Sequence, residues 1–442
     1  MQLRHYRNKI SEREILMIHP KMKWTYCGLD SHKDSHTAVF LDCFFEKLGE
    51  LNFGNCPGEF AGFLREAQKY KVKGTKIAFG FEDVSAYGRA LVVFLKGKKQ
   101  MVKHVNSSLV ANERKSYNVL HKTDSIDAEC AARVLLSRFN EMPVADPQDK
   151  HWILNNFVTR RNYLMKINHA LKSQVHGLIA DNYPSYRKFF SVIDCKTSLS
   201  FFETYPSPST LEGMTPEELH QFMKQTAPSR YPLKKAAQML ADIQKDGDTT
   251  SEYQADRDVI IQSTIRQIRY NIKEVEEIDK ALKNFLLNFD YPLTSMRGID
   301  TVTAARLIAE IGDISRFSSP AKLAKYAGVS PVTYASGKSD VQFSNERGNR
   351  RLNEIFYQLA LFNITTSGVN RKVLNFHFRD YYYKKISEGK TKRQSLKCVE
   401  RRLVNIIWGI MTYKTEYRNP PMYNLPLEEE ETTDEKEKSA SH

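Results

Sequence analysis

Residues 25–30, TYCGLD, form a short apolar run that ends in an acid, Asp30, and this run sets the fold of the N-terminal third of the chain. Runs of similar length follow, and alternation and β-branched content mark them as strands. They are HTAVFLD (36–42), GELNFGN (49–55), KIAFGFE (76–82) and MVKHVN (101–106). Helical spacing marks GEFAGFLREAQKYK (58–71) and SAYGRALVVFLKGKK (85–99). The order of these segments predicts a mixed α/β sheet.

The predicted sheet fits an RNase H-like (RuvC-like) core, in which the first and fourth strands are neighbours. Asp30 and Glu82 each end one of these strands, at the sheet edge where ligands bind in open α/β folds. Asp124 and Asp127 follow in KTDSIDAECAARVL, three residues apart at the start of a helix, and can project from one face of it. We therefore expect four carboxylates to meet at one point.

Four converging carboxylates repel one another, and divalent cations relieve that repulsion. Oxygen ligands suit Mg²⁺ or Mn²⁺, and two such ions can activate a nucleophile and stabilise the leaving oxygen in phosphoryl transfer. Other interpretations of the same residues stay open. An aspartate that ends a strand is also a common turn residue, and Thr123 with an acid after it is also a helix-capping pattern. The metal site depends on the combination and order of the four acids.

The remainder of the 442-residue chain is expected to be largely helical. Three- and four-residue apolar steps from about 150 to 180 and from 255 to 288 predict a coiled coil or a long helical hairpin. Prolines between them indicate short helices and loops, to which no role is assigned. The predicted domains are a basic N-terminal extension (1–24), the α/β domain (25–148), a helical region (149–290) with an insertion (181–250), a mostly helical C-terminal domain (291–425) and an acidic disordered tail (426–442).

A formal charge of +14, despite the acidic tail, indicates a polyanionic partner, although a basic soluble protein has the same composition. Six scattered cysteines without a CxxC pair fit reduced thiols and argue against a structural zinc. The first residues lack the apolar core of a signal peptide, and no apolar run is long enough to span a membrane. We expect a cytoplasmic protein with no membrane partner.

Three segments of the C-terminal part carry candidate nucleic-acid chemistry. In SMRGIDTVTAARLIAEIGDISRF (295–317) a Gly-Ile-Asp turn between two expected helices is helix-hairpin-helix-like, and such a turn can hold a DNA phosphate. Ser336 precedes a glycine in a polar loop and could act as a nucleophile, although Ser-Gly is also ordinary turn chemistry. A basic helix (389–411) follows. The cations expected to contact phosphates are Lys338, Arg347, Arg350, Arg351, Lys390, Lys392, Arg393, Lys397, Arg401 and Arg402.

The sequence resembles the DEDD-type insertion-sequence transposases (the family one-ten group) and is similar to the Piv-like DNA invertases. YCGLDSHKDSHTAVFLD, FGFE and KTDSIDA carry the N-terminal part of the resemblance. YAGVSP, SG and GNRRLNEIFYQLA match the C-terminal segment of the same family in order and spacing. The resemblance covers about 25–145 and 255–415. It departs in the 181–250 insertion and after Glu82, where Asp83, Val84 and Ser85 replace the usual small residue, Thr and Gly.

The resemblance implies specific roles for these residues. Asp30, Glu82, Asp124 and Asp127 would be the metal ligands, and Ser336 the nucleophile, with Ser339 and Ser344 as nearby alternatives. It also implies a structured noncoding (bridge) RNA partner and a dimer or tetramer in which the serine of one subunit completes the carboxylate site of another. The 255–288 segment is a candidate oligomerisation arm.

The resemblance implies DNA strand exchange, in which the protein cuts and rejoins DNA by metal-assisted transesterification with a serine nucleophile. Three other functions compete with it. A RuvC-like structure-specific nuclease would need the four acids and water but no serine. An ATP-binding protein of the actin and sugar-kinase type would need a second glycine-rich phosphate loop, which the sequence lacks downstream. A non-catalytic nucleic-acid-binding protein would need none of the acids.

Overall fold

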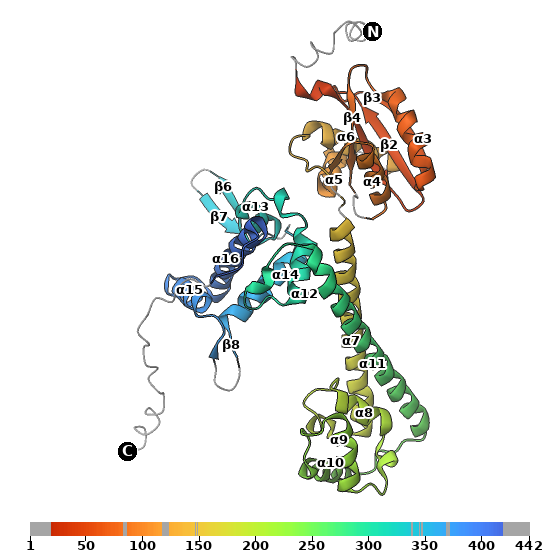
Figure 1. The fold of residues 1–442 in the computed structure, drawn as a ribbon, viewed down its shortest axis with the longest axis vertical. Helices are drawn as coiled ribbons and strands as arrows, with labels where there is room; N and C mark the ends of the chain where they lie inside the picture. The colour runs from red at the N-terminus through yellow and green to blue at the C-terminus, as the bar shows by residue number, and fades with distance from the viewer. Residues whose placement is uncertain are drawn as a thin grey trace. The chain divides into compact units, whose positions relative to one another are not determined.

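The computed structural model describes residues 19–82, 86–116, 123–145, 147, 149–336, 339–343, 345, 348–367 and 372–418. Within these ranges the chain forms two compact units, residues 1–153 and 154–442, whose boundary lies inside helix α7 (Figure 1). No helix in the described ranges is long and apolar enough to cross a membrane.

The first unit is built on a five-stranded mixed sheet, as the sequence predicts. Its strands are β1 (Trp24–Ser31), β2 (Ser35–Leu41), β3 (Lys47–Gly54), β4 (Lys76–Phe81) and β5 (Met101–His104). The spatial order is β3-β2-β1-β4-β5, in which β4 runs parallel to both β1 and β5 and the other pairs are antiparallel. The neighbouring first and fourth strands are thus confirmed, and the order is consistent with an RNase H-like core.

Helices cover both faces of this sheet. The helices are α3 (Pro57–Ala67), α4 (Arg89–Gly97), α5 (Ser107–Ser116) and α6 (Asp124–Ser137). One core contains Leu29 and Phe79 with side chains of α3 and α4, and another contains Tyr26 and Ala78 with side chains of α5 and α6. Because side chains alternate along a strand, the residues after Leu29 and Phe81 point to the α6 side.

Two long helices belong to the second unit: α7 (Asp149–Asn182), from Leu154 onward, and α11 (Gln254–Phe285). They pair antiparallel: the rings of Phe157 and Phe285 lie 5.7 Å apart, and Arg161 Nη2 donates to Asp279 Oδ2 at 3.1 Å. The helices predicted around 150–180 and 255–288 are therefore a long helical hairpin within one chain.

The insertion between these helices is a small helical unit. It contains α8 (Lys196–Thr204), α9 (Pro216–Thr226) and α10 (Leu233–Asp246), with short 3-10 turns at Tyr186–Lys188 and Pro208–Leu211. Aromatic side chains, among them Tyr183, Phe189 and Phe201, pack into its core against α7 and α11. The prediction of short helices and loops here is confirmed.

The C-terminal part forms a separate helical core. Its elements are α12 (Thr301–Ile311), α13 (Pro320–Tyr326), the hairpin β6 (Val332–Ser336) and β7 (Ser339–Phe343), α14 (Arg350–Ile364), the short strands β8 (Thr366–Ser367) and β9 (Lys372–Val373), α15 (Phe376–Ser387) and α16 (Lys392–Tyr413). Buried side chains of α12, α13, α14 and α16 form one cluster with the first residues of α7 in this unit and the end of α11.

The helix-hairpin-helix-like segment differs from the prediction at its start. In place of a first helix there is a 3-10 turn, Leu293–Ser295, and only α12 follows as a full helix. Gly298 has φ +93°, and a Cβ there would lie 2.5 Å from the ring of Phe362. Asp300 then caps α12 by accepting from the Thr303 amide at 2.7 Å. The Gly-Ile-Asp turn is thus explained by packing and capping.

Candidate active site

The candidate site lies where β1, β4 and α6 converge at the carboxyl edge of the parallel strands. The register pairs Leu29 with Phe81, so Asp30 and Glu82 each stand one residue beyond this pair. Alternation turns both toward α6. The sheet therefore brings two acids that are 52 positions apart in the sequence to the same edge and the same face.

Two glycines allow α6 to approach the sheet closely. Gly28 and Gly80 are cross-strand partners on β1 and β4. A Cβ on Gly28 would lie 2.1 Å from the carbonyl oxygen of Ala128, and one on Gly80 would lie 3.1 Å from Leu135 Cδ2. The backbone of α6 thus rests against β1, which holds the first turn of the helix at the strand ends.

The first turn of α6 supplies the other two acids. Thr123 caps the helix, its hydroxyl accepting from the Ile126 amide at 3.3 Å. The capping interpretation is therefore correct for Thr123, and the carboxylates of Asp124 and Asp127 remain available for other contacts. Asp127 is buried, whereas the side chain of Asp124 is 58% exposed.

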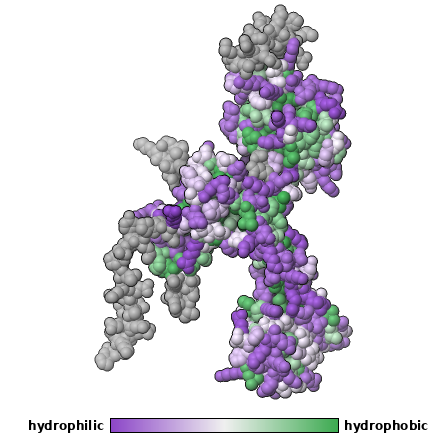
Figure 2. All heavy atoms as spheres, viewed as in Figure 1, coloured by the Kyte–Doolittle hydropathy of each residue, from purple (hydrophilic) through white to green (hydrophobic). Residues whose placement is uncertain are grey.

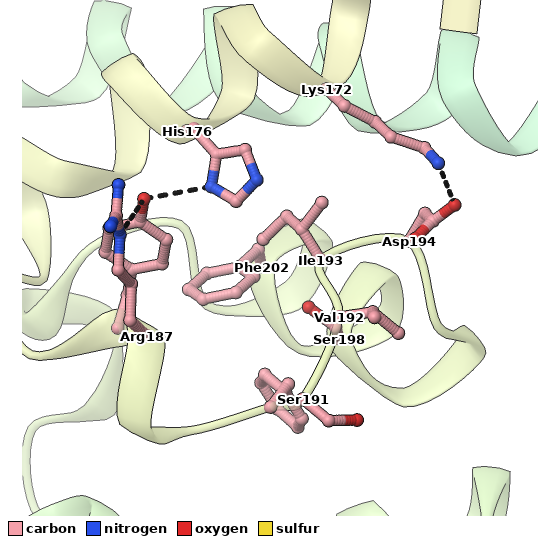
Figure 3. Close-up of a pocket in the computed structure, with 11 residues that line it drawn as sticks. Lys172, His176, Arg187, Ser191, Val192, Ile193, Asp194, Ser198 and Phe202 are labelled. Carbon is pink, nitrogen blue, oxygen red and sulfur yellow. Dashed lines mark hydrogen bonds and ion pairs between the residues drawn. The ribbon is translucent and has the colours of Figure 1, made fainter. Parts of the chain in front are cut away.

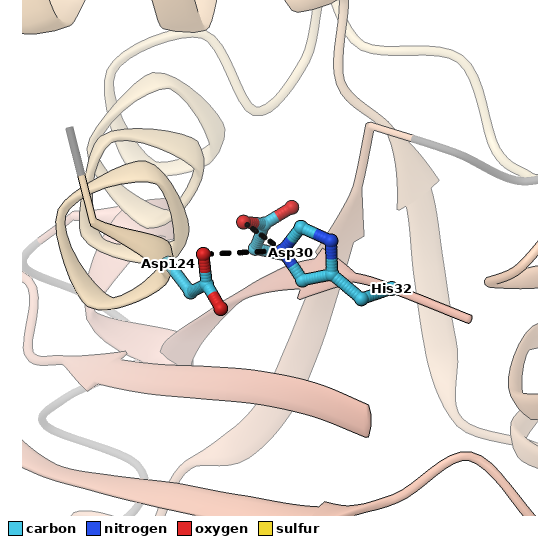
Figure 4. Close-up of side chains that lie close together, drawn as sticks. All are labelled: Asp30, His32 and Asp124. Atoms are coloured by element: carbon cyan, nitrogen blue, oxygen red, sulfur yellow. Dashed lines mark hydrogen bonds and ion pairs between the residues drawn. The ribbon is translucent and has the colours of Figure 1, made fainter. Parts of the chain in front are cut away.

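His32 links Asp30 to Asp124. Its Nε2 lies 3.2 Å from Asp30 Oδ2 and 3.2 Å from Asp124 Oδ1, as Figure 4 shows. Ligand atoms of the three residues all lie within 4.8 Å of one another, close enough to hold one metal ion. His32 was not among the sequence candidates, because a polar residue after a strand is an ordinary turn residue.

Arg114 of α5 forms an ion pair with the buried carboxylate of Asp127. Arg114 is also close enough to Glu82 for its positive charge to lower the pKa of that acid. Arg114 was likewise absent from the sequence candidates, because helix α5 was not predicted. The site thus contains a cation from the protein beside two of its four acids.

The pKa shifts reflect the crowding of these carboxylates. Burial, together with the charges of Asp30 and Asp127, raises the pKa of Glu82 to about 7. Burial also raises the pKa of Asp30, opposed by His32 and reinforced by Asp124 and Asp127. All four predicted acids therefore interact electrostatically, and a bound divalent cation would relieve the repulsion between them. The residues present fit a metal site of carboxylate oxygens with one imidazole nitrogen.

Ser336 is the last residue of β6, opposite Ser339 on β7, so it stands directly before the connection of a β-hairpin. Only the backbone of these two serines is described. The predicted phosphate contacts Lys338 and Arg347, and the alternative nucleophile Ser344, lie outside the described residues.

The predicted phosphate contacts on α14, on α16 and just before α16 fall into two groups. Arg350, Arg351, Lys390, Lys392, Arg393 and Arg402 are exposed, and of these Arg351 lies 3.5 Å from Glu310 and Arg402 lies over the Tyr381 ring. Lys397 and Arg401 have partners inside the protein: Lys397 Nζ donates to the buried Glu400 at 2.6 Å, and Arg401 Nη1 donates to the carbonyl of Pro320 at 2.9 Å. Their contacts explain these two cations without a nucleic acid.

Comparison with known proteins identifies both halves of the chain. A transposase model of the DEDD type from the IS110 group matches residues 27–184, and the Transposase IS116/IS110/IS902 family model matches residues 290–376. Together the two matches include all four clustered acids and the β6–β7 hairpin.

Relatives from insertion elements agree with these matches. An uncharacterized 44.8 kDa protein of insertion element IS116 from Streptomyces clavuligerus is 22% identical over 399 residues, 90% of this chain and 96% of the relative. An uncharacterized 42 kDa protein of IS900 from Mycobacterium paratuberculosis is 23% identical over 87% of this chain and 95% of the relative. A transposase for IS1328 from Yersinia enterocolitica is 31% identical over 94 residues, 21% of this chain and 28% of the relative. The chain belongs to the IS110/IS116 family of insertion-sequence transposases.

Proposed function

We propose that this transposase exchanges DNA strands by transesterification, with a metal site at Asp30, Glu82, Asp124 and Asp127 and with Ser336 as nucleophile. Family membership already implies DNA binding and the cleavage and rejoining of DNA. The observation that carries the proposal is the convergence of four acids, with His32, at the carboxyl ends of β1 and β4.

A divalent cation, Mg²⁺ or Mn²⁺, would be held by these carboxylates and would stabilise charge on the phosphate and the leaving oxygen. Around it the protein orients the ligands: the sheet fixes Asp30 and Glu82, and the close packing of α6 on Gly28 fixes Asp124 and Asp127. Arg114 neutralises part of the carboxylate charge before metal binds.

In the proposed strand transfer the Ser336 oxygen attacks a DNA phosphorus. The bond from that phosphorus to the neighbouring nucleotide breaks, and the departing oxygen takes up the proton that the serine hydroxyl loses. One phosphodiester is replaced by a serine–phosphate ester, so rejoining needs no ATP. The position of Ser336 beside a hairpin connection supports this role, because such connections usually lie on the protein surface, where a DNA strand can reach them.

The remaining elements of the proposal concern partners. We include a structured noncoding (bridge) RNA that selects the DNA, and a dimer or tetramer in which Ser336 of one subunit meets the carboxylates of another. The α7–α11 hairpin is the proposed oligomerisation arm, since it presents exposed apolar side chains such as Tyr163, Met165 and Tyr270. The exposed cations Lys390, Lys392 and Arg393 are proposed to contact phosphates.

Recombination in cells tests the proposal. The protein is co-expressed with the noncoding segment that flanks its gene and with two DNA partners, and the DNA junctions are sequenced. We expect recombinant junctions with the wild-type protein and none with Asp127→Asn, while Glu129→Gln, a change on the same helix outside the cluster, recombines normally. Junctions formed by Asp127→Asn, or formed equally without the noncoding segment, would contradict the proposal.

A RuvC-like endonuclease that uses water, or a Piv-like site-specific invertase, is the alternative. The acid cluster supports a water-dependent nuclease as well as it supports a serine recombinase, because all of its residues lie in the first unit and Ser336 is not needed to build it. Hydrolytic cleavage that survives Ser336→Ala, with no rejoined product, would identify the nuclease. Inversion of the segment between two sites in the absence of RNA would identify the invertase.

A further inference from the structure

The insertion between α7 and α11 contains two adjoining cavities of about 400 Å³ each. Arg187, Phe190 and Ser191 line both, so the two cavities share a wall. In the first cavity, Lys172 and His176 of α7 face the segment around Arg187 to Phe202 (Figure 3). None of these residues belongs to the DEDD cluster or to the Ser336 hairpin.

Positive charge is concentrated at these cavities. Residues 181–250 contain eight Lys and Arg and nine Asp and Glu, so the insertion as a whole has no excess of positive charge. Yet the second cavity is lined by Arg187, Lys188, Arg230 and Lys235 and by no acid. The first adds Lys172, which is paired with Asp194. The insertion therefore gathers cations around one surface. Hydrophilic side chains cover much of the face of the insertion that is visible at the bottom of Figure 2.

Most of these cations keep their charge uncompensated. Arg187 Nε donates to the Tyr186 hydroxyl at 3.3 Å, Arg230 Nη2 to the Ser191 hydroxyl at 3.5 Å, and Lys235 Nζ to the Lys188 carbonyl at 2.5 Å. These acceptors are neutral, and within the described part of the chain none of the three cations pairs with a carboxylate. Lys188 alone has an acid nearby, Asp242 at 3.8 Å. Such a cluster repels itself unless an anion binds.

The cavity walls add apolar surface and one unsatisfied polar group. Phe190, Val192 and Phe202 line the first cavity, and Phe190 and Tyr231 contribute to the second. Ser198 also lines the first cavity; it is fully buried, and its hydroxyl has no hydrogen-bond partner among the described residues. Because leaving a buried hydroxyl unpaired is unfavourable, this group indicates a polar ligand atom inside the cavity.

We propose that these cavities bind an unpaired nucleic-acid strand, with its phosphates on the Arg187, Lys188, Arg230 and Lys235 surface and a base in the Ser198 cavity. A cationic surface beside apolar hollows fits a single strand, because its bases are free to leave the backbone and enter a pocket. A duplex keeps its bases stacked inside and offers only a phosphate ridge. The site would be a second nucleic-acid contact of the transposase, independent of the strand-exchange chemistry.

Binding by the full-length protein tests the proposal through matched variants. The test variant is Arg187→Ala with Arg230→Ala; the control is Lys224→Ala with Lys245→Ala, which removes the same charge from exposed positions outside both cavities. Fluorescence anisotropy is measured over a salt series with labelled single-stranded RNA, single-stranded DNA of the same sequence, and the DNA duplex.

We expect the test variant to weaken single-strand binding and to lower the log–log salt slope by about 1.4, roughly 0.7 for each phosphate that the protein no longer neutralises. The control keeps the wild-type slope. Weaker binding of RNA alone, of single-stranded DNA alone or of both supports the proposal and identifies the source of the strand. Weaker binding of the duplex alone, an equal effect of the control, or an unchanged slope overturns it.

A second measurement locates the strand on the protein. Photocrosslinking with a strand that contains 4-thiouridine or 4-thiothymidine is expected to modify peptides around Phe190 or Tyr231. Ser191→Asp adds negative charge at an exposed position of the shared wall and should reduce that crosslink severalfold. Crosslinks confined to other parts of the chain would overturn the proposal even where the anisotropy changes.

Discussion

Gly28 of β1 and Ala128 of α6 are in direct backbone contact: a Cβ on the glycine would lie 2.1 Å from the Ala128 carbonyl oxygen. The obstacle is backbone and cannot rotate away, so any side chain at position 28 must move the helix. Because α6 carries Asp124 and Asp127, this contact connects the packing of the sheet to the geometry of the candidate metal site.

Gly28→Ala is therefore expected to reduce both stability and metal binding. We expect the free energy of unfolding to fall by about 3 kcal/mol, the upper end of the usual cost of overpacking, because no side chain can relax to make room. Urea denaturation and calorimetric metal titration measure the two effects. Gly177→Ala in α7, where the added Cβ meets nothing within 4 Å, is the control and should be neutral or stabilising by up to about 1 kcal/mol. A Gly28→Ala protein as stable as wild type would contradict the packing argument.

The raised pKa of Glu82 predicts a pH-dependent stability of the metal-free protein. The folded pKa of about 7 exceeds the ordinary value of 4.5, so the folded state binds more protons between these pH values and loses stability as pH rises through them. In EDTA at pH 8, Glu82→Gln should be more stable than wild type by about 1–2 kcal/mol, a figure that allows for solvent screening at this partly exposed acid.

Thermal unfolding at pH 5 and pH 8 measures this difference. At pH 5 the two proteins should be nearly equal, and adding Mn²⁺ at pH 8 should stabilise wild type more than Glu82→Gln. Parallel stability curves for the two proteins across this pH range would show that Glu82 is not crowded by the other acids.

His32 is expected to influence which metal binds. Imidazole favours later transition metals, whereas Mg²⁺ prefers oxygen. His32→Ala should weaken Co²⁺ binding by about tenfold or more, because removing even a residue that only supports a metal ligand typically lowers metal affinity by that much. The same change should affect Mg²⁺ binding far less. Isothermal titration with each ion gives the loss of affinity for Co²⁺ relative to that for Mg²⁺. The control is His169→Ala on α7, because His169 is exposed whereas His36 is buried. Equal losses for both ions would indicate that His32 only orients the acids.

Arg114 and a metal ion compete for Asp127. Arg114→Gln should lower the unfolding temperature of the metal-free protein, since it leaves a buried carboxylate without its cation, and should tighten Mn²⁺ binding. Arg133→Gln, which breaks the Arg133–Glu129 pair on α6, is the control and should cost about 0.3–0.5 kcal/mol without changing metal affinity. Weaker Mn²⁺ binding by Arg114→Gln would mean that the arginine supports the bound ion instead.

Particular residues show how far the sequence predicts this site. Alternation and composition were enough for the five strands, and the strand ends located Asp30 and Glu82 because a period of two fixes which side chains share a face. The DxxD spacing located Asp124 and Asp127 by the helical period. Local periodicity contains no information on which helix approaches which strand, so the tight contact at Gly28 and the roles of His32 and Arg114 emerged only from the structure.

The C-terminal part shows the converse limit. The basic helix was predicted from its charges, yet Lys397 and Arg401 have partners within the protein, and charge patterning cannot distinguish a cation that contacts a neighbouring carbonyl from one that is free. The selection of Ser336 depended on resemblance to a family, since a Ser-Gly pair has no periodicity that would mark it as a nucleophile.

The most direct measurement of the central claim is the search for a covalent protein–DNA adduct in a denatured strand-exchange reaction with end-labelled DNA. We predict that the wild-type protein and Ser339→Ala form the adduct in the presence of Mg²⁺ or Mn²⁺, and that Ser336→Ala and Asp127→Asn do not. Mass spectrometry of the adduct should locate the nucleotide on Ser336. An adduct that persists in Ser336→Ala, or exchange without any adduct, would contradict the account.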